Sequence, residues 1–338
     1  MGGSIVLILM YLVGVVFPGF FAPYGKQQEF DQIYTPPTKI QFIDEEGQLH
    51  LRPFVYKYEQ HMDPETWQIV VKPDKSKKFP IHFFVRGKKY NILGLFETNI
   101  HLFGVEEGGD IFIFGTDDIG RDIFSRSIYA MRISLTIGFV GIGLTMIFGL
   151  LFGGLSAIIG GIVDDIIQRI IELLLSIPKI PLWMALSASI PKRWSPLTVY
   201  FVIIIILSFM SWTRLARVVR SKFISLREED FVLAARSFNT YTMTIIWKHM
   251  VPNFISYILV HLTLAIPGMI LAETSLSFLG IGLRPPIVSL GVLLERAQSF
   301  QNVSMFPWIL IPGVLVVISV LAFNFVGDGL RDAADPYQ

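Results

Sequence analysis

Two glutamates lie within stretches of the sequence that are otherwise apolar enough to cross a membrane. Glu172 follows Arg169 by three positions, whereas Glu273 has no basic residue one helical turn away. A carboxylate inside a bilayer is costly and marks a solute path, an ion pair or a partner contact. We predict that Glu172 pairs with Arg169 on one helix surface. Glu273 is our candidate for a substrate path, where it would face a pore or a partner subunit.

The sequence lacks the motifs that would give the chain a catalytic chemistry of its own. Both Gly-Lys pairs, at Gly25 and Gly87, lack the upstream glycine and the following hydroxyl residue of a phosphate-binding loop. The patterns HExxH and GxSxG are absent as well. The chain has no cysteine, and its histidines have no ligand spacing. We therefore expect no enzyme activity, no cofactor and no metal site in this chain.

A charged, amphipathic segment covers residues 225–253, between two apolar stretches. Ser225 and Glu228 match a capping box, which predicts a helix beginning at Leu226. Apolar side chains then recur at helical spacing up to Asn239, a residue that favours a helix end. These side chains are Phe231, Ala234, Ala235 and Phe238. A second short helix is expected over 241–249, so that periodicity alone indicates a surface hairpin outside the bilayer.

Composition places the chain among polytopic membrane proteins. Of 338 residues, 52% are hydrophobic and 16% are charged, and the net charge of +1 gives no reason to expect a nucleic-acid partner. We predict an all-α membrane protein with six transmembrane helices, five in a core and one at the N-terminus, since a span needs about 20 apolar residues. The predicted spans are residues 4–24, 134–159, about 164–188, 197–212, 251–278 and 305–326.

The stretch between the first two spans has the composition of a water-soluble domain. Residues 25–113 contain short β-branched runs, among them one that predicts a strand over 110–114. The runs are separated by turn residues, including those at 72–74 and 86–87, so we predict a β-rich insert. Residues 114–133 interleave arginines with apolar residues and predict an amphipathic helix at the membrane interface. Residues 134–338 would form the core, in which Gly149 and Gly153 have the spacing that lets a second helix approach closely.

Basic residues predict which side of the membrane each loop occupies. Seven lie between residues 214 and 250: Arg214, Arg217, Arg220, Lys222, Arg227, Arg236 and Lys248. Each would cost roughly 2.5–3.5 kcal/mol at the centre of a membrane helix, and short basic loops stay in the cytoplasm. Loop 214–250 is therefore predicted to be cytoplasmic. Counting the spans places both termini in the cytoplasm and the insert outside the cell membrane.

Several motifs resemble one family of transport proteins. Ala234, Ala235 and Pro252 have the spacing of the EAA loop of permease subunits of binding-protein-dependent ABC importers, although Leu233 and Asn239 replace its Glu and Gly. The segment from Gly115 to Leu135, with its GTD and GRD motifs, closely resembles C-type subunits of oligopeptide and dipeptide importers. Stretches 271–286 and 321–336 resemble the same subunits, whereas residues 39–113 have no counterpart in the resemblance.

The resemblance implies an inner-membrane subunit of a prokaryote that forms half of a translocation pore with a B-type permease. Two ATP-binding subunits, which would hold ATP and Mg, would dock inside, and a substrate-binding protein would dock outside. The residues implied to contact an ATPase are Phe231, Ala234, Ala235, Arg236, Phe238 and Asn239. The implied solute is a peptide, although related permeases carry oligosaccharides or nickel chelates. We expect the insert to help dock the binding protein.

One other function fits part of the pattern. A membrane-anchored receptor or assembly scaffold would use the insert to bind a ligand and the spans as an anchor. Such a scaffold need not co-purify with ATPase chains, whereas an importer subunit must. A passive channel is disfavoured, because the sequence contains no filter-like loop or repeated polar ring.

Overall fold

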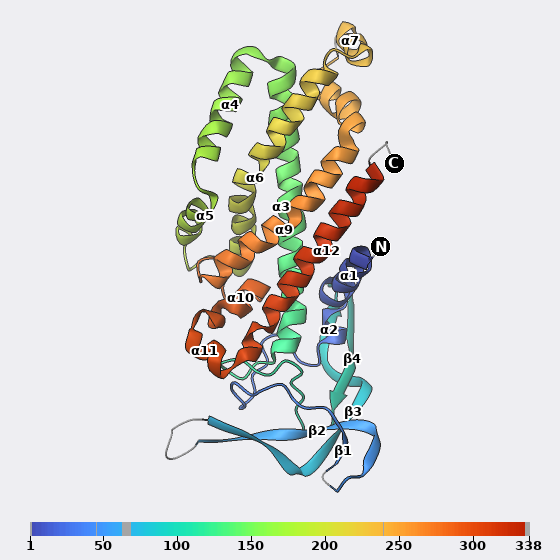
Figure 1. Ribbon diagram of the computed structural model, residues 1–338, viewed down its shortest axis with the longest axis vertical. Coiled ribbons are helices and arrows are strands. Elements are labelled where there is room, and N and C mark those ends of the chain that lie inside the picture. Colours follow the sequence, from blue (N-terminus) through green and yellow to red (C-terminus); the bar gives the residue numbers. More distant parts are fainter. Residues whose placement is uncertain (1, 45, 63–68, 239, 335–338) are drawn as a thin grey trace.

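The computed structural model describes residues 2–44, 46–62, 69–238 and 240–334 of the chain. Long apolar stretches form helices, because a helix satisfies its backbone hydrogen bonds internally where no water is available. Most helices run roughly along the long axis of one bundle, and the four strands lie at one end of it (Figure 1).

The α-helices are α1 (Gly2–Tyr11), α2 (Pro18–Phe21), α3 (Ile123–Ile159), α4 (Gly161–Ser176), α5 (Lys179–Ala188), α6 (Pro196–Leu226), α7 (Asp230–Ser237), α8 (Thr242–Thr244), α9 (Ile255–Phe278), α10 (Leu290–Leu294), α11 (Phe300–Met305) and α12 (Ile311–Ala334). Short π-helical segments are η1 (Leu12–Val16) and η2 (Ile245–Met250). Short 3-10 segments are η3 (Pro252–Phe254), η4 (Glu295–Gln298) and η5 (Pro307–Leu310).

Among the described residues, four helices are long and apolar enough to cross a membrane. They are α3, α6, α9 and the unit Pro307–Ala333, which joins η5 to α12. Helices α4 and α5 pass the same test only as a pair, bent by 87° at the break near Pro178. The apolar stretch Gly2–Val16 is shorter than the others. The fold is thus that of a helical membrane protein with four spans, or five if the bent pair is one, and the predicted count of six is not confirmed.

Helix α3 is longer than the span predicted for it. It runs without a break through 37 residues, from Ile123 to Ile159, where the sequence predicts a separate interfacial helix over 114–133 followed by a span. Asp122 caps its first turn by accepting a hydrogen bond from the Ser125 amide at 2.7 Å. Arg126 is 4% exposed and does not lie at a water-facing surface. Its guanidinium pairs with the buried Asp117 carboxylate. Because this ion pair satisfies the arginine inside the protein, the helix continues into the bundle without a separate interfacial segment.

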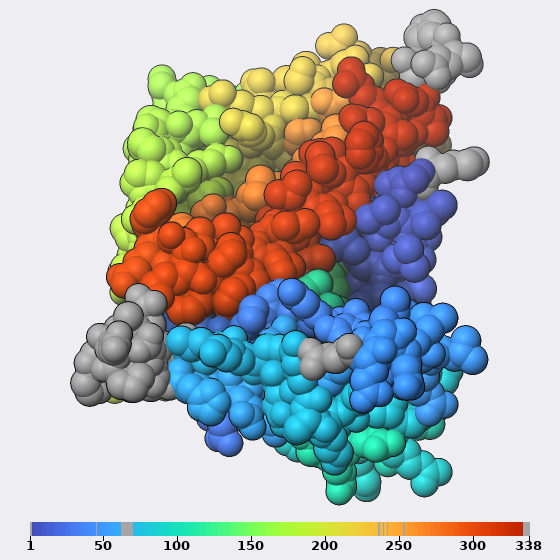
Figure 2. Space-filling model, turned by 60° about the horizontal axis from the view of Figure 1, so that its bottom comes forward, coloured from blue at the N-terminus to red at the C-terminus, as the bar shows by residue number. Residues whose placement is uncertain are grey.

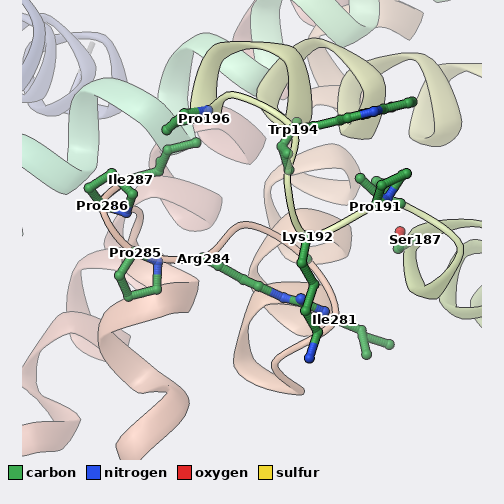
Figure 3. A pocket seen from close by; sticks show the side chains of 13 residues that line it. Ser187, Pro191, Lys192, Trp194, Pro196, Ile281, Arg284, Pro285, Pro286 and Ile287 are labelled. Carbon is green, nitrogen blue, oxygen red and sulfur yellow. The ribbon is translucent and has the colours of Figure 1, made fainter.

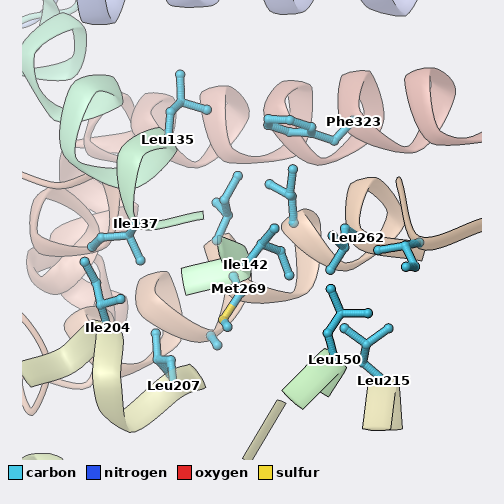
Figure 4. Close-up of a cluster of buried hydrophobic side chains, with 14 of the residues drawn as sticks. Leu135, Ile137, Ile142, Leu150, Ile204, Leu207, Leu215, Leu262, Met269 and Phe323 are labelled. Carbon is cyan, nitrogen blue, oxygen red and sulfur yellow. The ribbon is translucent and has the colours of Figure 1, made fainter. Parts of the chain in front are cut away.

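Glycines let α3 and α6 pack with their backbones close together, as their spacing predicts. A Cβ on Gly153 would lie 2.5 Å from the Ala216 carbonyl oxygen, and one on Gly149 would lie 2.6 Å from the Leu215 side chain. Lipid chains are as apolar as leucine, so close packing stabilises such helix pairs in a membrane. Figure 4 shows the interior that results, with buried side chains from α3, α6, α9 and α12. Labelled members are Leu135, Ile137, Ile142, Leu150, Ile204, Leu207, Leu215, Leu262, Met269 and Phe323.

The predicted β-rich insert is present as a four-stranded antiparallel sheet. The strands, in spatial order, are β1 (Gln41–Ile43), β2 (Leu49–Met62), β3 (Ile69–Ile92) and β4 (Phe96–Val105). The predicted turns at 72–74 and 86–87 are wrong, because β3 continues through both. Residues 72–74 pair regularly with β2, and the register shifts only after them, between Asp74 and Lys78 of β3. A second register shift lies between Arg86 and Tyr90 and includes Gly87. The predicted strand over 110–114 is also absent, and there Thr38 donates its amide to the Phe112 carbonyl instead.

The sheet and α7 lie at opposite ends of the bundle (Figure 1). Figure 2 shows the insert, coloured blue to cyan, as a layer across its end of the helices. Any partner that binds α7 therefore approaches from the side opposite the sheet.

Candidate functional site

Helix α7 and its flanks, residues 227–240, form the candidate coupling segment, and their boundaries differ from the prediction. Helix α6 continues through Ser225 to Leu226, and α7 begins only at Asp230. The capping box at Ser225 is therefore wrong, since its amide lies inside a helix and needs no cap. The predicted second helix over 241–249 is a short α-turn followed by the π-helical segment η2.

The side chains of the candidate coupling segment divide between two faces. Val232 is 0% exposed and Ala235 is 8% exposed, and both belong to the hydrophobic core of the chain. Phe231, Leu233 and Phe238 are 37%, 47% and 84% exposed. Ala234 is exposed beside them, so Ala235 does not share the outward surface that the sequence predicts. The Arg236 side chain and Asn239 lie outside the described residues.

An ion pair joins α4 to α6 at the same end of the bundle. Arg220 of α6 donates through Nε to the Asp164 carboxylate of α4 at 2.6 Å, and the two groups also share a second contact. Ser156 at the end of α3 donates to the same carboxylate. Three helices thus meet at one acidic side chain. On α4 the predicted pair of Arg169 with Glu172 is confirmed, since Nη1 and Oε2 are 3.0 Å apart on the exposed surface.

Glu273 lies in the interior of the chain, enclosed by serines. Its side chain is 0% exposed and accepts hydrogen bonds from Ser134 at 3.2 Å, Ser277 at 2.8 Å and Ser289 at 2.7 Å. The serines also accept backbone amides: Ser134 from Leu290 and Ser277 from Leu283. This serine cage joins α3, α9 and the loop before α10. Glu273 therefore does not face a pore or a partner in this conformation, because its acceptors are used to hold three segments together.

The GTD and GRD motifs form a corner between the insert and α3. Gly115 and Gly120 have φ of +76° and +78°, and a Cβ on Gly120 would lie 1.9 Å from the Phe30 carbonyl oxygen. The Asp117 carboxylate accepts the Arg121 side chain at 2.9 Å and also pairs with buried Arg126. Trp308, before α12, donates to the Thr116 carbonyl at 3.2 Å. The motifs thus position the insert on the bundle through backbone geometry and one shared carboxylate.

Burial of Asp122 at this corner predicts a pH dependence of stability. Desolvation raises the pKa of its carboxyl from 3.8 to about 7 in the folded chain. Between those values the unfolded chain loses a proton that the folded chain retains, so stability falls as the pH rises from about 4 to about 7. Asp122→Asn keeps a neutral cap and should flatten this fall. The thermal midpoint of the purified protein, measured against pH, checks it, and equal slopes for both proteins would contradict it.

A cavity of about 300 Å³, here called the loop pocket, opens between the α5–α6 loop and the α9–α10 loop. Lys192 and Trp194 come from the first loop, and Arg284 and two prolines come from the second. Figure 3 shows Lys192 and Arg284 among the side chains that line the pocket. The α9–α10 loop that lines the pocket lies in the half of the bundle nearer the sheet (Figure 1).

Comparison with known proteins gives the class of this fold. Residues 145–337 match the family model described as binding-protein-dependent transport system inner membrane component, which covers more than half of the chain. The chain belongs to this family of membrane permease components. The helices found here agree with such a role, and the resemblance noted from the sequence motifs is confirmed.

Two individual relatives and one solved structure are similar to this chain. The chain is 37% identical over 224 residues to the oligopeptide transport system permease protein OppC of Bacillus subtilis (strain 168), covering 66% of this chain and 71% of the relative. It is 38% identical to the dipeptide transport system permease protein DppC of Alkalihalophilus pseudofirmus, with 66% and 71% covered. A chain of the MetNI methionine ABC transporter in inward facing conformations aligns with TM-score 0.47 and 19% identity, covering 63% of this chain and 98% of that chain.

Sequence reasoning missed the serine cage and the pair of Arg220 with Asp164. Ser277 follows Glu273 by four positions, which was a readable signal, since such residues share a helix face. Ser134 is 139 positions from Glu273, so only the packing of α3 on α9 brings the two together. Arg220 and Asp164 are likewise 56 positions apart.

Proposed function

We propose that this chain is one of two permease subunits that form the pore of an ATP-driven peptide importer. The second subunit would be a B-type permease, and the solute class is taken from the relatives named for oligopeptide and dipeptide transport. In an importer the solute passes between the helices of two permease subunits. The described helices would form one half of the wall of this passage.

The two ends of the helix bundle support one orientation of the chain in the membrane. We propose six crossings, in which Gly2–Phe21 and the bent pair α4–α5 join the four long helices. The α7 end carries exposed Arg217 and Lys222 and would be cytoplasmic by the positive-inside rule. The sheet at the opposite end would then be extracytoplasmic. Both termini would be cytoplasmic.

The observation that carries the coupling role is the apolar surface on α7. Phe231, Leu233, Ala234 and Phe238 are exposed together at the end opposite the sheet. The importer would contain two ATP-binding subunits, which hold ATP and Mg, and one of them would receive this surface of the permease in a cleft. Arg236 would contact the rim of that cleft, while Val232 and Ala235 anchor α7 to the permease.

Ala234→Asp should uncouple the importer. The new carboxylate would be buried without a partner in the contact, at a cost of a few kcal/mol, which corresponds to at least tenfold less docked ATPase. We expect substrate-stimulated ATP hydrolysis by the assembled complex to fall accordingly, while the permease itself folds, because Ala234 is exposed.

Ala333→Asp is the matched control, since it adds the same charge to an exposed alanine near the end of α12. It should leave hydrolysis within twofold of the unmodified complex. Full stimulated hydrolysis by the Ala234→Asp complex would show that α7 does not couple to the ATPase.

We further propose that the insert helps dock a substrate-binding protein. Its sheet exposes large apolar side chains, among them Leu51 at 97% and Phe96 at 70%, which fits a surface that a second protein covers. Deleting residues 39–100 should weaken the affinity of the binding protein for the complex at least tenfold, as measured by surface binding. An unchanged affinity would remove this role.

A further inference from the structure

A second cavity, here called the helix pocket, lies between α3, α5, α6 and α9. It has a volume of about 330 Å³ and is lined by Lys179, Arg214 and His261, which come from three different helices. Lys179 is the first residue of α5, just after the break in the bent pair, and Thr145 of α3 lies in the middle of its helix. The pocket is therefore placed partway along the spans and not at an end.

The helix pocket is positively charged and has no counter-ion in the part of the chain that the structure describes. None of its described lining residues is acidic, and no carboxylate of the described ranges pairs with Lys179, Arg214 or His261. Helix α6 continues to Leu226, so Arg214 lies in this helix and not in the cytoplasmic loop that the sequence predicts. The Arg214 side chain is exposed on the surface of the single chain, and that of Lys179 is partly exposed. Unpaired Lys and Arg side chains within a membrane span are costly and mark a solute or ion path.

One face of α5 connects the helix pocket with the loop pocket. Trp183 lines the helix pocket and Ser187, one helical turn later, lines the loop pocket. The Trp183 Nε1 and the Ser187 Oγ are buried, and neither has a hydrogen-bond partner among the described residues. Buried donors are normally paired, so each of them is available to an acceptor other than the described residues of this chain. Each pocket thus combines cationic side chains with one free donor.

We propose that the loop pocket and then the helix pocket bind a carboxylate of the transported solute as it crosses. A carboxylate has only acceptors, which match the Lys192 and Arg284 cations in the first pocket and Lys179, Arg214 and the Trp183 indole N–H in the second. Two weak sites in succession allow the solute both to enter and to leave. This inference rests on the proposed importer function and specifies which group of the solute the chain recognises.

The experiment uses the complete importer, with its partner subunits and binding protein, in phosphatidylcholine liposomes. Uptake is measured for one peptide with a free C-terminal carboxylate and for the same peptide with a C-terminal amide. The variants are Lys179→Gln with Arg214→Gln in the helix pocket, and Lys192→Gln with Arg284→Gln in the loop pocket. Arg217→Gln is the matched control, since Arg217 is an exposed arginine of α6 that lines neither pocket.

Each variant is compared with the unmodified importer for each peptide, so that any preference of the binding protein cancels. We expect each pocket variant to reduce uptake of the carboxylate peptide roughly tenfold, as expected for lost charged hydrogen bonds, and uptake of the amide less than twofold. The control should change neither. Equal losses for both peptides would overturn the proposal, because they indicate a structural role.

A membrane lipid is the other source of an anionic group. If the pockets hold a lipid phosphate, adding phosphatidylglycerol to the liposomes would change uptake by the unmodified importer and not by the pocket variants, without discrimination between the peptides. That result would also overturn the proposal. Failure of the importer function itself is distinct, since the unmodified complex would then take up neither peptide on addition of ATP.

Discussion

Replacing Glu273 by alanine should destabilise the permease more than any change at its surface. The substitution leaves the hydroxyls of Ser134, Ser277 and Ser289 without their acceptor in a region where the glutamate is 0% exposed. Each buried group without a partner costs about 1–3 kcal/mol, so three such groups give an expected loss of about 3–9 kcal/mol. The thermal midpoint of the detergent-purified complex and its yield from membranes should both fall.

Two further variants separate this structural role from a role in the solute path. Glu172→Ala removes an exposed pair and should cost about 0.5 kcal/mol or less. Glu273→Gln keeps an acceptor for the serines, so it should retain most of the stability. If Glu273→Gln assembles normally and yet abolishes uptake, the carboxylate serves transport as well. Normal stability of Glu273→Ala would show that the serine cage does not hold these helices.

Replacing Gly153 by alanine should separate α3 from α6. The added Cβ would lie 2.5 Å from the carbonyl oxygen of Ala216, and a backbone atom cannot rotate away as a side chain can. Overpacking of this kind costs about 1–3 kcal/mol, and it acts on the interface that spans the bundle. We expect a lower thermal midpoint and a smaller fraction of assembled complex.

The same helix supplies a control variant that should not lower the stability. Gly143 of α3 has no heavy atom within 4 Å of the position its Cβ would occupy. Alanine is a better helix former than glycine by about 1 kcal/mol, so Gly143→Ala should be neutral or stabilising. Equal stability of the two variants would mean that the approach of α3 to α6 does not depend on Gly153.

The candidate coupling segment shows what helical periodicity can predict and what it cannot. Helical spacing of Phe231, Ala234, Ala235 and Phe238 predicts one apolar face, and an amphipathic helix is present at this place. The pattern cannot tell whether an apolar side chain faces the rest of its own chain or a partner. Core packing takes up Ala235 and leaves Phe231 and Phe238 outside. The corner at Gly115 shows the same limit, because its motifs predict family membership but not the carboxylate that Arg121 and Arg126 share.

The amino-acid sequence by itself determines that this chain is a polytopic membrane protein of a known permease family, with a β-rich insert. Those properties depend on local composition, hydrophobic periodicity and short motifs. The tertiary structure alone decides that α3 is one continuous helix, that Glu273 is enclosed by serines, and that two cationic pockets adjoin one face of α5. These features join residues that are far apart in the chain, and only helix packing fixes the distances between them.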